Sequence, residues 1–411
     1  MRYGAIAAVI LLITGIVTCG CMGTSQDTGK SKDIVIGALV PLTGDWSAKS
    51  QNINTAIDLA VQDTNANLAS AGSSTRVRLL GEDTGTDPEI ALQKIKKLHE
   101  AGVRIVVGPA SSAEIARVKD WADQNNMVIL GYSSTAPSLS IAGDNVFRMV
   151  PDDTRQGEAM AAYLNKSGTR VIIPVVRNDI WGTNLLSATK TRFERTGGIV
   201  SEPYLYEPGT RDFTKVVPNL SARVAAAQHQ YGNTTVGVYV ICLDEIVPLL
   251  SSASDYSPLA SVKWFGSDGT AKVDVLIKNA SAARFAAGTG FYNPLYGAEE
   301  ESAGAMEVKD RIRAITGSEP DAYSLAAYDA AAIAARSLII SDDATYEQLK
   351  NSVELTAGYY HGITGWTKFV QSGDRAYAVY HFWTVSMNNG TATWEQVARY
   401  QSDPNQKGGF T

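Results

Sequence analysis

Residues 103–125 read VRIVVGPASSAEIARVKDWADQN and contain the pattern that decides the fold. The β-branched run 103–107 predicts a buried strand, and the amphipathic stretch 113–125 predicts a helix. Between them lies a turn of Gly, Pro and Ala that ends in two hydroxyl side chains, Ser111 and Ser112. A strand that leads directly into a helix is half of a βαβ unit, the building block of parallel sheets.

The same alternation extends in both directions from this unit. The patterns predict strands at 34–40, 76–80 and 127–130, and helices at 52–64 and 88–101. Pro88 suits a first helical turn and Gly102 suits a helix end. Four strands that alternate with three helices predict right-handed crossovers and a doubly wound, mostly parallel sheet.

A second α/β unit is predicted after Pro151. Its strands are expected at 170–176, 199–205, 235–242 and 262–266, and its helices at 155–165, 184–196 and 245–252. The last third of the chain adds predicted helices at 323–340 and 346–352 and a β-rich segment at 377–386. Because a chain of 411 residues exceeds what one hydrophobic core usually serves, two domains are expected.

Charge and cysteine content limit the classes of function. The net charge of −6 is spread without a basic stripe, so nucleic acid is not an expected partner. After removal of a leader, Cys242 would be the only free thiol, so no internal disulfide is expected. We expect the protein to be a monomer.

The N-terminus has the layout of an export signal. Arg2 precedes an apolar run at 5–17, which is shorter than the roughly 20 residues that span a membrane. The pair Gly20-Cys21 resembles a lipobox, which implies cleavage before Cys21 and lipidation of its thiol. We therefore assign 1–21 to a signal and lipobox segment and 22–32 to a flexible tether, with the mature protein anchored outside the cell. The alternative is an uncleaved N-terminal anchor.

Several short motifs, in order, resemble one known family. They are the opening run IVIGALVPLTG at 34–44, VGPASS at 107–112, SSTAP at 133–137, Trp181-Gly182, FGSDG at 265–269 and GITG at 362–365. In this order and spacing they resemble the type I periplasmic binding proteins, in particular the leucine/isoleucine/valine-binding branch of ABC-transporter receptors. The resemblance covers nearly the whole mature chain.

This resemblance implies an α/β architecture of two doubly wound, Rossmann-like lobes joined by three hinge crossings, with a ligand buried between them when the hinge closes. It places 33–150 plus 289–359 in lobe 1 and 151–288 plus 360–411 in lobe 2. The implied partners are a small amino-acid-like ligand and the permease subunits of an ABC importer. No cofactor and no metal is implied.

The resemblance also implies which residues bind the ligand. Ser111, Ser112 and Thr135 match positions that bind the ligand carboxylate, and Ser133 matches one whose carbonyl accepts from the ligand ammonium. Trp181 matches an aromatic side chain that closes over the ligand, and Asp268 matches an acid that pairs with the ligand ammonium. Tyr323 matches an aromatic side chain behind the ligand. In the first loop either Trp46 or Lys49 faces the cleft.

Each assignment has a structural alternative, and some residues depart from the family pattern. The serines at 111 and 112 can simply cap a helix, and the segment 133–137 can be an ordinary turn. Trp181 can pack in the core or between the lobes, and Asp268, which lies beside glycines, can be a turn residue. The run Cys242-Leu243-Asp244-Glu245 places two acids at the cleft edge, where the family has a small side chain. The ligand therefore remains open among branched-chain amino acids, polar amino acids, amides and urea-like compounds.

Catalysis and ligand sensing are the two alternatives to solute delivery. An enzyme is not expected, because the four histidines lack the spacing of a metal site and no nucleophile elbow is present. A ligand-sensing receptor keeps the same fold and binds an amide, a urea-type compound or another small carboxylate. The polar end of the chain at Thr411 favours a freestanding receptor over a sensor that continues into the membrane.

Overall fold

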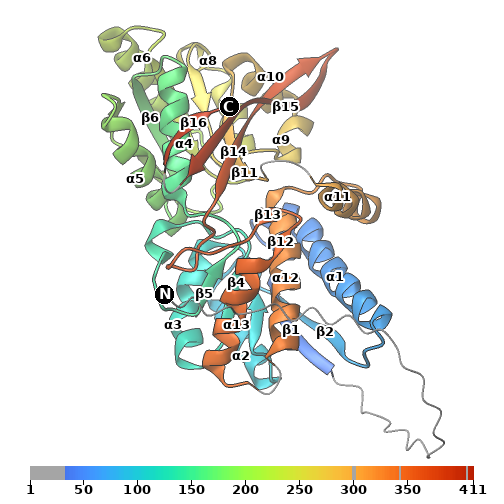
Figure 1. The fold of residues 1–411 in the computed structure, drawn as a ribbon. Coiled ribbons are helices and arrows are strands. Elements are labelled where there is room, and N and C mark those ends of the chain that lie inside the picture. The colour runs from blue at the N-terminus through green and yellow to red at the C-terminus, as the bar shows by residue number, and fades with distance from the viewer. Residues whose placement is uncertain (1–32, 299–301, 342–343, 404–405) are drawn as a thin grey trace, which may run out of the picture.

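The computed structural model describes residues 33–298, 302–341, 344–403 and 406–411. The predicted signal segment, Cys21 and the tether therefore lie outside the described residues. The described chain forms two α/β lobes, which Figure 1 shows one above the other. The predicted α/β class with two parallel sheets is confirmed.

Lobe 1 is built on a parallel sheet with the strand order β2-β1-β3-β4-β5. Its strands are β1 (Asp33–Val40), β2 (Arg76–Asp83), β3 (Ile105–Val107), β4 (Val128–Gly131) and β5 (Val146–Arg148). Its helices are α1 (Ser47–Ser70), α2 (Pro88–Glu100), α3 (Ser112–Gln124), α11 (Ala303–Thr316), α12 (Ala322–Ile340) and α13 (Tyr346–Tyr359). A short 3-10 turn, η1, covers Pro137–Leu139. Strands β1, β3 and β4 are almost wholly apolar, as expected for a sheet with helices on both faces, whereas the edge strand β2 reads RVRLLGED and is partly exposed.

Lobe 2 contains a second parallel sheet with the order β10-β9-β6-β7, and β8 also pairs with β6. Its strands are β6 (Val171–Arg177), β7 (Ile199–Val200), β8 (Tyr204–Tyr206), β9 (Val236–Ile241) and β10 (Lys263–Phe265). Its helices are α4 (Asp153–Lys166), α5 (Ile180–Glu194), α6 (Val216–Tyr231), α7 (Ile246–Ala253), α8 (Ser257–Ala260), α9 (Asp274–Lys278) and α10 (Ala280–Thr289).

An antiparallel sheet with the order β11-β14-β15-β16 completes lobe 2. Its strands are β11 (Asn293–Gly297), β14 (Ala378–Asn388), β15 (Thr391–Asp403) and β16 (Gln406–Phe410). We expected 289–297 in lobe 1, but β11 pairs with β14, and Tyr292 forms a bridge to Phe265 of β10. This part of the expected boundary is wrong, because the antiparallel pairing keeps the segment with lobe 2.

The chain passes between the lobes after β5, after β11 and again before β14. The last passage includes a small hairpin of β12 (His361–Gly362) and β13 (Gly365–Trp366). Arg148 at the end of β5 is fully buried and donates from Nε to Oδ1 of Asp374 at 2.5 Å. This pair ties the first passage to the third, and it joins two segments that are far apart in sequence.

Candidate functional site

A cavity of about 210 Å³ lies between the lobes at the carboxyl ends of their parallel strands. We call it the central cavity. Its lining from lobe 1 is Asp45, Trp46, Thr86, Pro88, Ala110, Ser111, Ser112, Ala113 and Ser133, and from lobe 2 Arg177, Asp179, Trp181, Pro208, Leu243 and Asp268. Loops at the carboxyl ends of such strands are where α/β folds bind small ligands.

The start of helix α3 forms one wall of the central cavity. Ser111 is the N-cap, and its hydroxyl and its N–H are both engaged with Glu114 in a capping box. Burial raises the pKa of Glu114, although hydrogen bonds from Ser111 oppose the rise. The Oγ atom of Ser112 lies 3.0 Å from Oγ of Ser134 and accepts from the N–H of Ala136 at 3.2 Å. Both serines therefore hold the local structure and line the cavity at the same time.

The loop after β4 contains Ser133 and Thr135. Ser133 donates to the carbonyl of Ala110 at 2.7 Å, which fixes one cavity loop to the other. Thr135 does not line the cavity, and its hydroxyl donates to Oδ2 of Asp153 at 2.8 Å. Asp153 opens helix α4 of lobe 2, so this bond crosses between the lobes.

Asp268 is buried at the end of the β10 strand and both of its carboxylate oxygens accept hydrogen bonds. Oδ1 accepts from Nε2 of Gln156 at 2.9 Å, and Oδ2 accepts from the hydroxyl of Tyr323 on α12 of lobe 1. The amide of Gln156 also donates to Asp153 at 2.7 Å. Burial raises the pKa of Asp268, although the hydrogen bonds from these two donors lower it. Burial and the charge of the nearby Asp268 raise the pKa of Asp153 well above its usual value.

Two tryptophans bring aromatic surface to the cavity from opposite lobes. The backbone N–H of Trp46 donates to Oγ1 of Thr86 at 3.2 Å, and the centroid of the Trp46 ring lies 6.1 Å from that of the Tyr323 ring. Trp181 lies so close to Gly269 that a Cβ there would come within 2.7 Å of its ring. Lys49, the alternative to Trp46, lines a neighbouring cavity and pairs with Asp321 at 3.2 Å.

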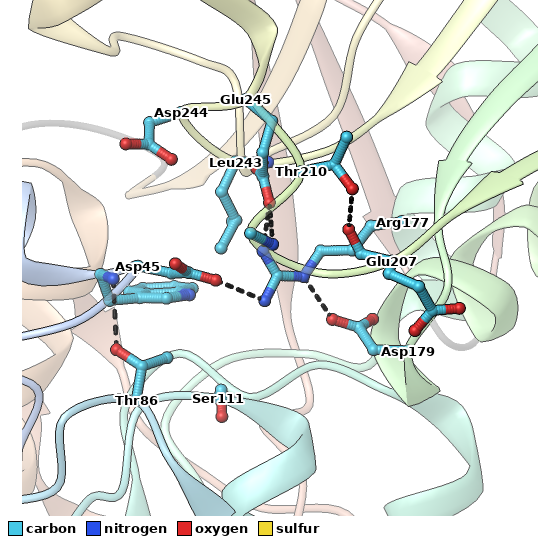
Figure 2. A network of polar contacts seen from close by, with 12 residues as sticks. Asp45, Thr86, Ser111, Arg177, Asp179, Glu207, Thr210, Leu243, Asp244 and Glu245 are labelled. Carbon is cyan, nitrogen blue, oxygen red and sulfur yellow. Dashed lines mark hydrogen bonds and ion pairs between the residues drawn. The ribbon is translucent and has the colours of Figure 1, made fainter. Parts of the chain in front are cut away.

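Sequence reasoning missed the most connected side chain of the cavity, Arg177. Figure 2 shows its guanidinium reaching Asp45 across the cleft while Asp179 and Glu245 hold it in lobe 2. The three nitrogen–oxygen distances are 2.8 Å to Asp45, 2.6 Å to Asp179 and 2.5 Å to Glu245. We call these four residues the Arg177 cluster. Arg177 is the last residue of β6, so its place at a strand end is the signal that was available.

The two acids expected at the cleft edge separate in the structure. Glu245 is 0% exposed, accepts from the N–H of Leu243 at 2.9 Å and does not line the central cavity. Asp244 is partly exposed and pairs with Arg211 at 2.9 Å. The expectation for Glu245 is therefore wrong, because Arg177 draws its carboxylate inward.

Within residues 33–298, 302–341, 344–403 and 406–411, no group of His, Cys, Asp and Glu side chains is arranged to hold a metal ion. None of the described helices is both long and apolar enough to span a bilayer. Cys242 is a buried free thiol, and burial raises its pKa well above the usual value.

The family model named "Periplasmic binding protein" matches residues 33–392, nearly the whole described chain. The chain belongs to the periplasmic binding protein family. This confirms the resemblance that the sequence motifs indicated. Membership of this family implies an extracytoplasmic location and a role in binding solutes.

Two relatives show how far the similarity of this periplasmic binding protein extends. An uncharacterised protein of Methanocaldococcus jannaschii is 29% identical over 415 residues, which covers 95% of this chain and 96% of the relative. The Leu/Ile/Val-binding protein homolog 3 of Brucella melitensis is 28% identical over 193 residues, 46% of this chain and 52% of the relative. The second match therefore spans about half the length of that protein.

Solved structures show the same fold. LivJ of Streptococcus pneumoniae, a branched-chain amino acid transporter substrate-binding protein in complex with isoleucine, gives a TM-score of 0.71 at 19% identity, covering 90% of this chain and 100% of LivJ. The TM-score is 0.69, at 16% identity, for a solute-binding protein of an ABC transporter from R. palustris in complex with benzoate. That match covers 88% of this chain and 95% of the R. palustris protein. Both identities are low, so these likenesses concern the fold of the periplasmic binding protein.

The structure brings most of the expected site residues of this periplasmic binding protein together. The central cavity is lined by Trp46, Ser111, Ser112, Ser133, Trp181 and Asp268. Thr135 and Tyr323 stand behind it, each bonded to an acid of the opposite lobe. Contact of any of these residues with a ligand remains a prediction.

Proposed function

We propose that this protein is the solute receptor of an ABC importer, that it captures a small amino-acid-like solute in the central cavity, and that it delivers the solute to a membrane permease. Cys21 anchors the mature chain, a monomer, to the outer face of the cell membrane through a lipid. The assignment of ligand class rests on the chemistry of the cavity walls. The family supports the broader role in binding and transport.

The observation that supports an amino-acid-like solute is the opposition of two kinds of polar wall. On lobe 1, the first turn of α3 presents N–H groups that have no partner within the helix, together with the hydroxyl side chain of Ser112. A helix start of this kind favours a carboxylate. On lobe 2, Asp268 presents an acid that suits an ammonium. A solute with both groups satisfies both walls at once.

The size of the cavity supports a small solute. Its volume of about 210 Å³ is below the roughly 300–1,000 Å³ of pockets for drug-sized ligands. Trp46, Trp181 and Leu243 supply apolar surface for a carbon skeleton. We expect an affinity near micromolar, about 8 kcal/mol, because much tighter binding slows release to the permease.

Ligand binding and lobe closure are coupled in this proposal. The Tyr323–Asp268 and Thr135–Asp153 hydrogen bonds join the lobes beside the cavity, so they form only when the lobes are together. A solute that contacts both walls binds the closed state better than the open state and shifts the population toward closure. Closure in turn buries the solute.

The experiment is a thermal-shift screen of the full chain in mild detergent against the amino acids, amides, ureas, small carboxylates and sugars. A ligand present at a hundred times its dissociation constant adds about 2.7 kcal/mol of stability. We expect a shift with at least one α-amino acid. A response only to benzoate-like or urea-like compounds would instead favour a receptor for an amide, a urea-type compound or another small carboxylate. Benzoate is included in the screen because one structural neighbour is in complex with it.

A further inference from the structure

The walls of the central cavity hold more negative than positive side chains. Asp45, Asp179 and Asp268 line it together with a single basic side chain, Arg177. Three carboxylates and one guanidinium give a formal charge of −2 for the lining. A neutral branched-chain amino acid leaves this charge uncompensated, because its own ammonium and carboxylate cancel.

Arg177 is already committed to protein carboxylates. Its Nε, Nη1 and Nη2 atoms donate to Asp179, Glu245 and Asp45, one carboxylate for each nitrogen. The Arg177 cluster therefore has three acids and one base, a formal charge of −2. A ligand anion added here meets a net negative group, whereas a ligand cation reduces the charge of the cluster.

The strand order separates the two acidic ends of the lobe 2 wall. Asp268 follows β10 and Arg177 ends β6, and β9 lies between these strands. Two strand spacings put these ends roughly 10 Å apart. Leu243, which follows β9, lies between them on the cavity wall. The wall thus offers an acid at each end and an apolar side chain in the middle.

A second cavity next to the central cavity has a net charge of the same sign. A neighbouring cavity of about 550 Å³ shares Asp45, Trp46 and Leu243 with the central cavity. It is lined by five acids and three lysines, again a formal charge of −2. A cleft with walls of one sign raises the local concentration of oppositely charged solutes.

From these observations we infer that the solute is cationic, with an α-amino-acid head at the Asp268 end and a second positive group on an aliphatic stem at the Asp45–Asp179 end. This inference rests on the proposed function, since it names the class of solute for the same cavity. It predicts a basic amino acid in preference to a branched-chain or an acidic one.

The test is isothermal titration of the full chain with L-lysine, L-leucine and L-glutamate. We expect lysine to bind at least tenfold more tightly than leucine, and glutamate to bind most weakly. Leucine or glutamate as the tightest ligand overturns the cationic class and leaves the proposed receptor function standing. If no compound of the thermal-shift panel binds, either by a shift of the melting temperature or by heat in the titration, the receptor function itself is overturned, and the inference with it.

A matched pair of variants isolates the charge at the cleft. Asp45→Asn removes an acid that is 27% exposed and lies 2.8 Å from its arginine. Asp63→Asn removes one that is 30% exposed and also lies 2.8 Å from its arginine, but that pair joins α1 to α11 and does not line the central cavity. We expect Asp45→Asn to reduce the lysine-to-leucine affinity ratio at least fivefold and Asp63→Asn to leave it unchanged. Equal ratios in both variants overturn the inference.

Salt dependence of the wild-type chain gives a second readout that needs no variant. Raising the salt from about 0.05 M to about 0.5 M shortens the screening length severalfold. The lysine affinity should then fall relative to the leucine affinity. A ratio that does not change with salt contradicts a selection based on charge.

Discussion

Arg177, the last residue of β6, donates from Nη2 to Oδ2 of Asp45 at 2.8 Å. This ion pair joins lobe 2 to lobe 1 at the wall of the central cavity. The other two nitrogens of Arg177 are held within lobe 2 by Asp179 and Glu245. The guanidinium is therefore fixed in one lobe and extends one bond to the other. Lobe closure brings Asp45 to a partner that is already in place.

Arg177→Met should destabilise lobe 2, because it leaves the fully buried Glu245 without its counter-ion. Removing one partner of a buried ion pair costs about 3–5 kcal/mol. We expect urea denaturation to show a loss of this size. The double variant Arg177→Met with Glu245→Gln should recover most of it, and a double variant as unstable as the single one would refute the pairing as the cause.

Asp268→Asn should weaken binding of any ammonium-bearing ligand found in the screen. Loss of one charge from a buried, hydrogen-bonded ionic contact costs about 2–5 kcal/mol, or a factor of roughly 30 or more in affinity. Tyr323→Phe keeps the acid but removes the inter-lobe hydrogen bond to it, so this variant measures the part of the loss that comes from weaker closure. Titration calorimetry measures both, and equal losses in the two variants would argue against a direct role for Asp268.

Gly269→Ala should disturb the cavity through its aromatic wall. An added Cβ would lie 2.5 Å from the carbonyl oxygen of Cys242 and 2.7 Å from the Trp181 ring. Such overpacking costs about 1–3 kcal/mol and displaces the ring, so both stability and ligand affinity should fall. Gly288→Ala in α10 is the matched control, because a Cβ at this position meets nothing within 4 Å. The substitution also replaces a glycine inside a helix. The control should be as stable as the wild type or up to about 1 kcal/mol more stable.

The pH dependence of stability should include a contribution from Asp144. Burial raises the pKa of Asp144 to about 6, with a further rise from Asp123 and opposition from Lys119 and Lys350. A carboxyl that holds its proton more tightly when folded stabilises the folded state at low pH. That contribution is lost as the pH rises from about 4 to about 6. Asp144→Asn should therefore become more stable than the wild type over this interval, by roughly 1 kcal/mol after allowance for solvent screening. A difference that is constant with pH would contradict this assignment.

Much of the lobe 1 fold follows from local pattern. The unit at 103–125 becomes β3 and α3, and Ser111 forms the predicted cap. The predicted strand at 199–205 is instead divided into β7 and β8, which pair with different parts of β6. Such a break depends on the partner strand, and the segment alone does not show it.

Other elements had signals that were passed over. Helix α6 contains Pro218, which resembles a breaker but falls in the first turn, where proline is tolerated. The β14–β15 hairpin turns at Asn389-Gly390, and both residues have positive φ. Asn-Gly is the strongest short-range signal for such a turn.

The site was less accessible to sequence reasoning than the fold. Ser112, Ser133 and Asp268 were placed through family motifs, and they line one cavity. Arg177 belongs to no such motif, and its three acids come from separate loops. Asp179 is a sequence neighbour of Arg177, but only the tertiary fold brings Asp45 and Glu245 to the same guanidinium, which is why the charge of the cavity could not be read from the chain.

The most direct test of the account is a crystal structure of the protein with the tightest ligand from the screen. The account predicts the ligand in the central cavity, with its carboxylate at the start of α3 and its ammonium within hydrogen-bond distance of Asp268. Ligand density elsewhere, such as in the larger cavity beside Arg375, or a ligand in the central cavity with no polar contact to either wall, would contradict it.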